Sequence, residues 1–111
     1  MISRERKSNI EIISFTESKL NAFTSDEIRE QVSQCFSEPN AYVIISLKGV
    51  EYIDSTGFGS LLFILRSAKS NYGKLKICSV EPHVMNLFES LHLNTVFEIY
   101  NDIDECIRSF S

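Results

Sequence analysis

The sequence lacks a long hydrophobic run. No apolar stretch approaches the roughly 18 to 20 residues that a membrane span requires, and the amino terminus lacks the apolar core of a signal peptide. These absences exclude a membrane-spanning class, and we expect a cytoplasmic protein.

Positive charge is also scarce. The chain has 11 Lys and Arg against 15 Asp and Glu, for a net charge of -4 at pH 7. The basic residues are scattered, except in RERK at residues 4–7. This distribution argues against a surface that follows the phosphates of a nucleic acid.

Cysteine is too sparse for a covalent or metal framework. Cys35, Cys78 and Cys106 are odd in number, widely spaced and set in apolar patterns. A disulfide framework and a zinc knuckle are therefore disfavoured. We interpret all three as small buried hydrophobic residues.

Four segments have the composition of strands. They are residues 9–15 (NIEIISF), 41–47 (AYVIISL), 75–80 (LKICSV) and 96–100 (VFEIY). Segment 41–47 is continuously apolar, which is typical of a strand buried on both faces between layers of helices.

Four helices are predicted to alternate with these strands. The first begins at Thr24, which forms a capping-box pattern with Glu27, and the fourth repeats that pattern with Asp102 and Glu105. The third has Pro82 in its first turn. Apolar residues at helical spacing should face the core: Ile28, Val32, Cys35 and Phe36; then Phe58, Leu61, Leu62, Leu65 and Ala68; then Val84, Leu87, Phe88 and Leu91; then Ile103, Cys106, Ile107 and Phe110.

A strand followed by a helix, repeated four times, predicts an α/β fold. We expect a mixed, mainly parallel sheet of about four to five strands, with right-handed crossovers and helices packed against it. The 111 residues, 43% hydrophobic and 23% charged, fit one soluble globular domain over residues 1–111.

Residues 51–60, EYIDSTGFGS, stand at the turn before the second helix. Asp54, Ser55 or Thr56 can each cap a helix, and glycine relaxes a tight turn. One cap is enough, however, and three side-chain oxygens stand in a row before Gly57. Bare glycines leave Ser55 open to a large partner, and the free amides and dipole of a helix start favour an anion such as phosphate.

The stretch VEYIDSTGFGSLLFILRSAKSNYGKLKICSVEPHVMNLFESLHLNTVFEI, residues 50–99, resembles the STAS domain of bacterial anti-sigma factor antagonists. The resemblance covers roughly residues 41–110, and its specific part is D-S-[ST]-G at residues 54–57. It implies a binding module without a cofactor, not an enzyme. A serine kinase that is also an anti-sigma factor would phosphorylate Ser55, or more weakly Thr56. The unmodified form would bind this kinase and free a sigma factor, until phosphorylation releases the antagonist and a serine phosphatase resets it.

The resemblance also implies a partner surface around the phosphorylated serine, made of Asn21, Asp54, Ser55, Thr56, Gly57 and Phe58. Residues 17–28, ESKLNAFTSDEI, depart from the family: no glycine precedes the first helix, and Asn21 stands near the usual aspartate. A missing carboxylate there points to a different partner, because charge complementarity governs partner choice. Phe58 is either a core residue or an exposed anchor, and its spacing from Leu61 and Leu62 favours the core.

Other interpretations remain open. A nucleophilic serine requires a base, and His83 and His92 are the only histidines, both expected on the surface at helix ends. The GFG at residues 57–59 is too short for a dinucleotide fingerprint, and Glu51 with Asp54 is more typical of a solvated loop than of a metal site. The main alternative is a STAS module of a two-component or biofilm pathway, or an accessory subunit of a transporter, that does not act on a sigma factor.

Overall fold

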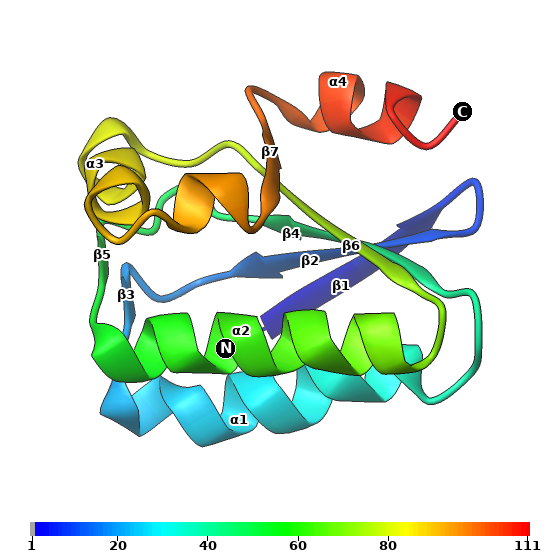
Figure 1. The fold of residues 1–111 in the computed structure, drawn as a ribbon, viewed down its shortest axis with the longest axis horizontal. Coiled ribbons are helices and arrows are strands. Elements are labelled where there is room, and N and C mark those ends of the chain that lie inside the picture. Colours follow the sequence, from blue (N-terminus) through cyan, green and yellow to red (C-terminus); the bar gives the residue numbers. More distant parts are fainter. Residues whose placement is uncertain (1) are drawn as a thin grey trace.

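Five strands form the main sheet in the order β1-β2-β4-β6-β7 (Figure 1). The computed structural model describes residues 2–111, with strands β1 Ile2–Lys7, β2 Ile10–Phe15, β4 Tyr42–Ser46, β6 Lys74–Cys78 and β7 Glu98–Tyr100. Strands β2, β4, β6 and β7 run parallel, and β1 is antiparallel to β2. The predicted mixed, mainly parallel sheet is confirmed.

Strand β1 is the strand of the main sheet that the apolar pattern did not predict, so the simple strand-helix alternation is wrong at this end of the chain. A two-residue turn joins β1 to β2, and both turn residues, Ser8 and Asn9, have positive φ (50° and 66°), as a type I′ hairpin turn requires. Arg4 and Arg6 of β1 lie 3.6 and 3.2 Å from Glu11 carboxylate oxygens. Because β1 is exposed beyond Ile2, it carries no apolar alternation, and its charges instead protect the sheet edge from further pairing.

Four helices surround the sheet: α1 Ala22–Ser33, α2 Ser55–Ser70, α3 Pro82–Ser90 and α4 Ile103–Arg108, with short 3₁₀ turns at Gln34–Phe36 and Leu93–Thr95. Helices α1 and α2 lie side by side over one face, and α4 covers the other (Figure 1). The main apolar core lies between the sheet and α1, α2 and α3, and a smaller one joins Ile10, Ile12, Ile44, Cys78 and Cys106 beneath α4.

Most of the residues predicted to face the core do so. In α2, Phe58, Leu61 and Ala68 are buried, and Ile64, outside the predicted stripe, is fully buried as well. The prediction for Leu91 is wrong, because α3 ends at Ser90 and the Leu91 side chain is 53% exposed.

Cysteine burial follows the prediction for two of the three residues. Cys78 and Cys106 are fully buried free thiols, whereas Cys35 is only half-buried. Cys78 and Cys106 act as small residues of the core under α4.

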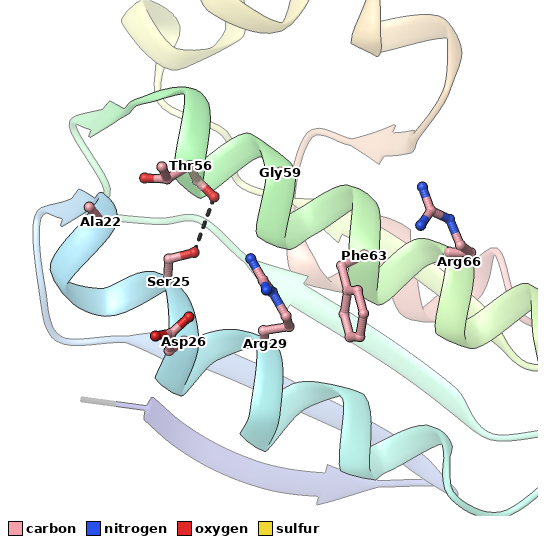
Figure 2. A pocket seen from close by; sticks show the side chains of 8 residues that line it. All are labelled: Ala22, Ser25, Asp26, Arg29, Thr56, Gly59, Phe63 and Arg66. Atoms are coloured by element: carbon pink, nitrogen blue, oxygen red, sulfur yellow. Dashed lines mark hydrogen bonds between the residues drawn. The ribbon is translucent and has the colours of Figure 1, made fainter.

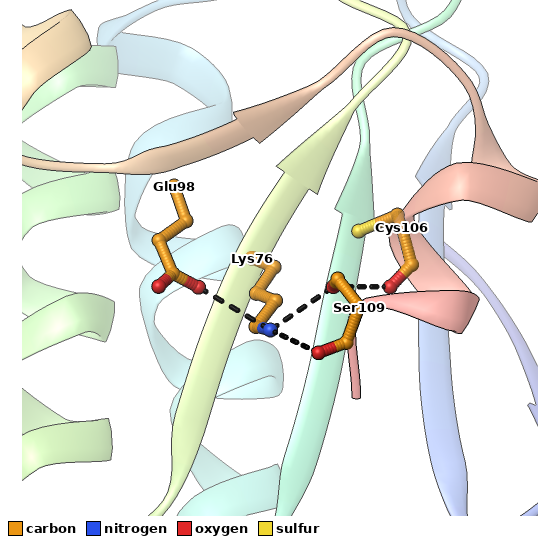
Figure 3. A network of polar contacts seen from close by, with 4 residues as sticks. All are labelled: Lys76, Glu98, Cys106 and Ser109. Carbon is orange, nitrogen blue, oxygen red and sulfur yellow. Dashed lines mark hydrogen bonds and ion pairs between the residues drawn. The ribbon is translucent and has the colours of Figure 1, made fainter. Parts of the chain in front are cut away.

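A buried lysine ties the carboxyl-terminal residues to the sheet (Figure 3). Lys76 of β6 is 5% exposed, and its Nζ donates to the Ser109 carbonyl at 3.1 Å and to the Ser109 hydroxyl at 3.0 Å. Glu98 lies 3.4 Å from Nζ, and the Phe110 ring centroid lies 4.3 Å away. The ammonium group is therefore satisfied although it is buried.

Candidate functional site

A two-stranded parallel sheet brings the starts of α1 and α2 together. Strand β3 (Lys19–Leu20) pairs with β5 (Tyr52–Ile53), with Leu20 opposite Ile53. Each strand runs straight into the cap of a helix, Asn21 for α1 and Asp54 for α2. The Asp54 amide donates to the Leu20 carbonyl at 3.1 Å. Asn21 and Asp54, two predicted site residues that are distant in sequence, are therefore neighbours.

Helix α1 begins at a different cap from the one predicted. The Asn21 side chain accepts a hydrogen bond from the Phe23 amide at 3.0 Å, and the Thr24 hydroxyl accepts one from the Asn21 amide at 3.0 Å. The predicted capping box of Thr24 and Glu27 is wrong, because the end of β3 places Asn21 at the cap and draws the Thr24 hydroxyl back onto it.

The Asp54 carboxylate caps α2 and accepts hydrogen bonds at the start of the helix. Its Oδ1 accepts from the Thr56 hydroxyl at 2.6 Å and from the Gly57 amide at 2.9 Å. These two bonds, with smaller contributions from the Thr56 and Ala22 amides, hold the pKa of the Asp54 carboxyl below its ordinary value. The site therefore carries a fixed negative charge at neutral pH.

The hydroxyls of Ser55 and Thr56 differ in their hydrogen bonding. Ser55 is the first residue of α2, its side chain is exposed, and its hydroxyl makes no hydrogen bond to another described residue. Thr56 is exposed too, but its hydroxyl is committed to the Asp54 carboxylate. Ser55 is thus the hydroxyl that a partner reaches without breaking a hydrogen bond to Asp54.

Gly57 and Phe58 are buried behind these hydroxyls. A Cβ on Gly57 would lie 2.5 Å from the Leu20 carbonyl oxygen and 2.8 Å from Cγ2 of Ile53, so the close approach of α2 to β3 requires glycine. Phe58 is 5% exposed and packs edge-to-face on Phe88, with ring centroids 5.1 Å apart. Its position agrees with the core alternative, and neither residue offers a partner much surface.

Phe23 is an exposed aromatic residue that the sequence pattern did not single out. Its side chain is 96% exposed on the first turn of α1, two positions after Asn21. Because Phe23 lies off the inward stripe of Ile28 and Val32, helical spacing already places it toward solvent.

A groove of about 370 Å³ runs between α1 and α2 and begins at Thr56 (Figure 2). Ser25 hydrogen bonds to Ser60 and, at 3.2 Å, donates to the Thr56 carbonyl, so small side chains hold the two helices close together. The groove is lined by Ala22, Ser25, Asp26 and Arg29 of α1 and by Thr56, Gly59, Phe63 and Arg66 of α2.

Metal and membrane features are absent from the part of the chain that the structure describes. Residues 2–111 contain no group of three or more His, Cys, Asp or Glu side chains placed to hold a metal ion. None of the helices in this range has the length and apolar content to cross a membrane.

Comparisons with known proteins agree on one family. A family model described as the STAS domain matches residues 1–106. The anti-sigma F factor antagonist of Paenibacillus polymyxa is 27% identical over 85 residues, which cover 76% of this chain and 73% of that protein.

Solved structures show the same fold. An anti-sigma factor antagonist (STAS) domain protein of Planctomyces limnophilus has a TM-score of 0.89 at 21% identity, covering 99% of this chain and 97% of that one. The anti-sigma factor antagonist SpoIIAA in its unphosphorylated form has a TM-score of 0.78 at 18% identity, covering 99% and 96%. The murine anion transporter Slc26a9 has a TM-score of 0.78 at 12% identity, covering 93% of this chain but 18% of that one.

Proposed function

Because the chain belongs to the STAS domain family, we propose that it is a phosphorylation-switched anti-sigma factor antagonist whose switch residue is Ser55. The observation that carries the proposal is the contrast between two adjacent hydroxyls. Ser55 is exposed and unbonded among the described residues, whereas the Thr56 hydroxyl lies 2.6 Å from the Asp54 carboxylate. A kinase can modify Ser55 without breaking any hydrogen bond of the described residues, but modification of Thr56 removes the bond that its hydroxyl donates to Asp54.

The unmodified chain binds an anti-sigma factor that is also a serine kinase. The contact surface is the rim around Ser55, formed by Asn21, Asp54 and Thr56, with Gly57 and Phe58 supporting it from beneath. Phosphorylation adds about −1.5 to −2 charges at neutral pH, next to an Asp54 carboxylate that is already ionised. Burying this charge against a partner without a counter-ion weakens binding by orders of magnitude. A serine phosphatase restores the binding form.

The switch is local and requires no catalysis by the chain itself. Ser55 is an exposed residue of the first turn of α2, so a phosphate there has room without movement of the backbone. We assign the chain a cytoplasmic binding role with no cofactor.

Incubation with the cognate kinase and ATP, followed by mapping of the modified peptide, tests the phosphoacceptor. Ser55→Ala should abolish phosphate incorporation, and the matched Thr56→Val variant should retain it. Phosphate on Thr56 alone, or on neither residue, contradicts the assignment.

Titration calorimetry against the purified kinase tests the switch. Ser55→Ala should bind as tightly as the parent chain, and Ser55→Asp should bind more weakly, although aspartate carries only one charge. Equal affinities for all three proteins would contradict the switch and would mean that the Ser55 hydroxyl has no role in partner binding.

A second function has one supporting observation. The fold also occurs within the murine anion transporter Slc26a9, as about a fifth of that chain, so a STAS module serving a transporter or another signalling pathway is the alternative. Parent protein that binds no anti-sigma kinase but co-purifies with a transporter would favour it.

A further inference from the structure

Residues of α1 and α2 line the groove between the two helices, and Figure 2 shows Phe63 pointing toward α1 while Arg66 points away from it. The groove opens next to Ser55, because Thr56 forms its end. Its two cations are Arg29 of α1 and Arg66 of α2, and Phe63 lies with them. A protein that covers Ser55 can therefore extend into the groove without leaving the surface.

The two arginines carry unneutralised charge. Neither Arg29 nor Arg66 forms an ion pair with a described carboxylate, although Asp26 also lines the groove, whereas Arg4 and Arg6 both pair with Glu11. The Arg29 guanidinium lies 5.2 Å from the Phe63 ring centroid, and its Nε is buried with no hydrogen-bond partner. A buried donor without an acceptor is costly, and the guanidinium group that carries it is the side-chain group that matches a carboxylate.

Gly59 leaves the floor of the groove bare. Packing explains Gly57, but a Cβ on Gly59 would meet no atom within 4 Å, and the residue is exposed within α2. Alanine is better than glycine inside a helix, so folding alone does not favour glycine here. A bare helix surface allows another backbone to approach closely.

We propose that the α1–α2 groove is the docking site for an acidic segment of the anti-sigma partner. Separate carboxylates of that segment bind Arg29 and Arg66, and its backbone lies over Gly59. This inference rests on the proposed function and adds a reason for release. Phosphate on Ser55, one residue before the groove begins, adds negative charge that repels an acidic segment lying in the groove.

An acidic probe tests the groove without the partner. Titration of ¹⁵N-labelled protein with a blocked hexaglutamate peptide at low salt should shift the Arg29 Nε–H and the Gly59 and Phe63 amides saturably. Arg29→Gln and Arg66→Gln should each reduce these shifts, and Arg108→Gln, on α4 across the sheet, should not. Absent or scattered shifts, or equal shifts in the groove variants, overturn the proposal.

Binding to the anti-sigma factor tests the docking itself. Arg29→Gln should weaken binding about tenfold or more, as expected for loss of a charge-assisted hydrogen bond. Gly59→Gln should weaken it by filling the groove, while Ser70→Gln, at the exposed far end of α2, serves as the control. Circular dichroism should show all variants folded, because the space at Gly59 is open.

The outcomes separate the two proposals. If the parent binds an anti-sigma factor and the groove variants bind equally well, the groove proposal is overturned and the proposed function stands. If no anti-sigma factor binds the parent, the proposed function fails, and the peptide titration alone decides whether the groove takes an acidic segment.

Discussion

Substitution of the two motif glycines by alanine should move stability in opposite directions. At Gly57 the new Cβ would lie 2.5 Å from the Leu20 carbonyl oxygen, a backbone atom that cannot rotate away. At Gly59 the same methyl group meets nothing within 4 Å. The two positions share one helix and one chemical change, so each variant is the control for the other.

The expected magnitudes follow from packing and helix propensity. Overpacking by one methyl group costs about 1–3 kcal/mol, and replacing glycine by alanine inside a helix stabilises by about 0.5–1 kcal/mol. An unfolding entropy of about 2.1 cal/mol/K per residue, multiplied by 111 residues, gives about 0.23 kcal/mol/K. The Tm should therefore fall by about 4–13 °C for Gly57→Ala and rise by about 2–4 °C for Gly59→Ala.

Thermal unfolding followed by circular dichroism at 222 nm measures both changes. A Gly57→Ala protein as stable as the parent would show that α2 can move away from β3 at little cost. A Gly59→Ala protein that is destabilised would show that this glycine serves the fold, which would remove one basis for assigning it to a partner.

Three further predictions concern the core, the cap and the carboxyl-terminal layer. Phe58→Ala should destabilise by about 3–5 kcal/mol in guanidinium titrations, since the ring is 5% exposed against Phe88; a loss below about 1 kcal/mol would contradict its core position. Because the folded-state pKa of Asp54 is depressed, the stability from its charge is present above the ordinary pKa of about 3.9 and lost as pH falls through the folded value. The stability difference between the parent and Asp54→Asn should therefore close on acidification, and a constant difference would argue against the cap charge. Lys76→Met removes two hydrogen bonds to Ser109 and should speed amide exchange in α4, unlike the control Lys74→Met on the same strand; equal exchange in both variants would contradict this anchoring.

The sequence allowed prediction of elements that bury apolar surface. The run at residues 41–47 became β4, buried in the middle of the sheet, and the spacing of Phe58 from Leu61 correctly indicated the core side of α2. Strand β1 was not predicted because nearly all of its residues are exposed and it shows no alternation of apolar and polar residues. Strands β3 and β5 were not predicted because two residues are too short for any periodic signal.

Only the features of the site that depend on neighbouring residues in the sequence could be predicted. The motif indicated a helix start with a capping oxygen, but three oxygens were equivalent until Asp54 took the cap. The groove depends on α1 lying beside α2, and the lack of an ion pair at Arg29, although Asp26 lines the same groove, depends on how the two side chains lie in three dimensions. Spacing along one helix carries neither kind of information.

The register of β3 and β5 has a direct consequence for the proposed switch. Because Leu20 pairs with Ile53, the Asp54 carboxylate stands between both helix starts and already accepts the Gly57 amide. A phosphate on Ser55 therefore cannot take that amide without displacing an ionised carboxylate of the same sign. We therefore expect the phosphate to stay at the surface, where a partner meets its charge, and not to bind the amides at the amino terminus of α2. On this basis we expect the proposed switch to act through the proposed docking surface and to leave the fold of the chain unchanged.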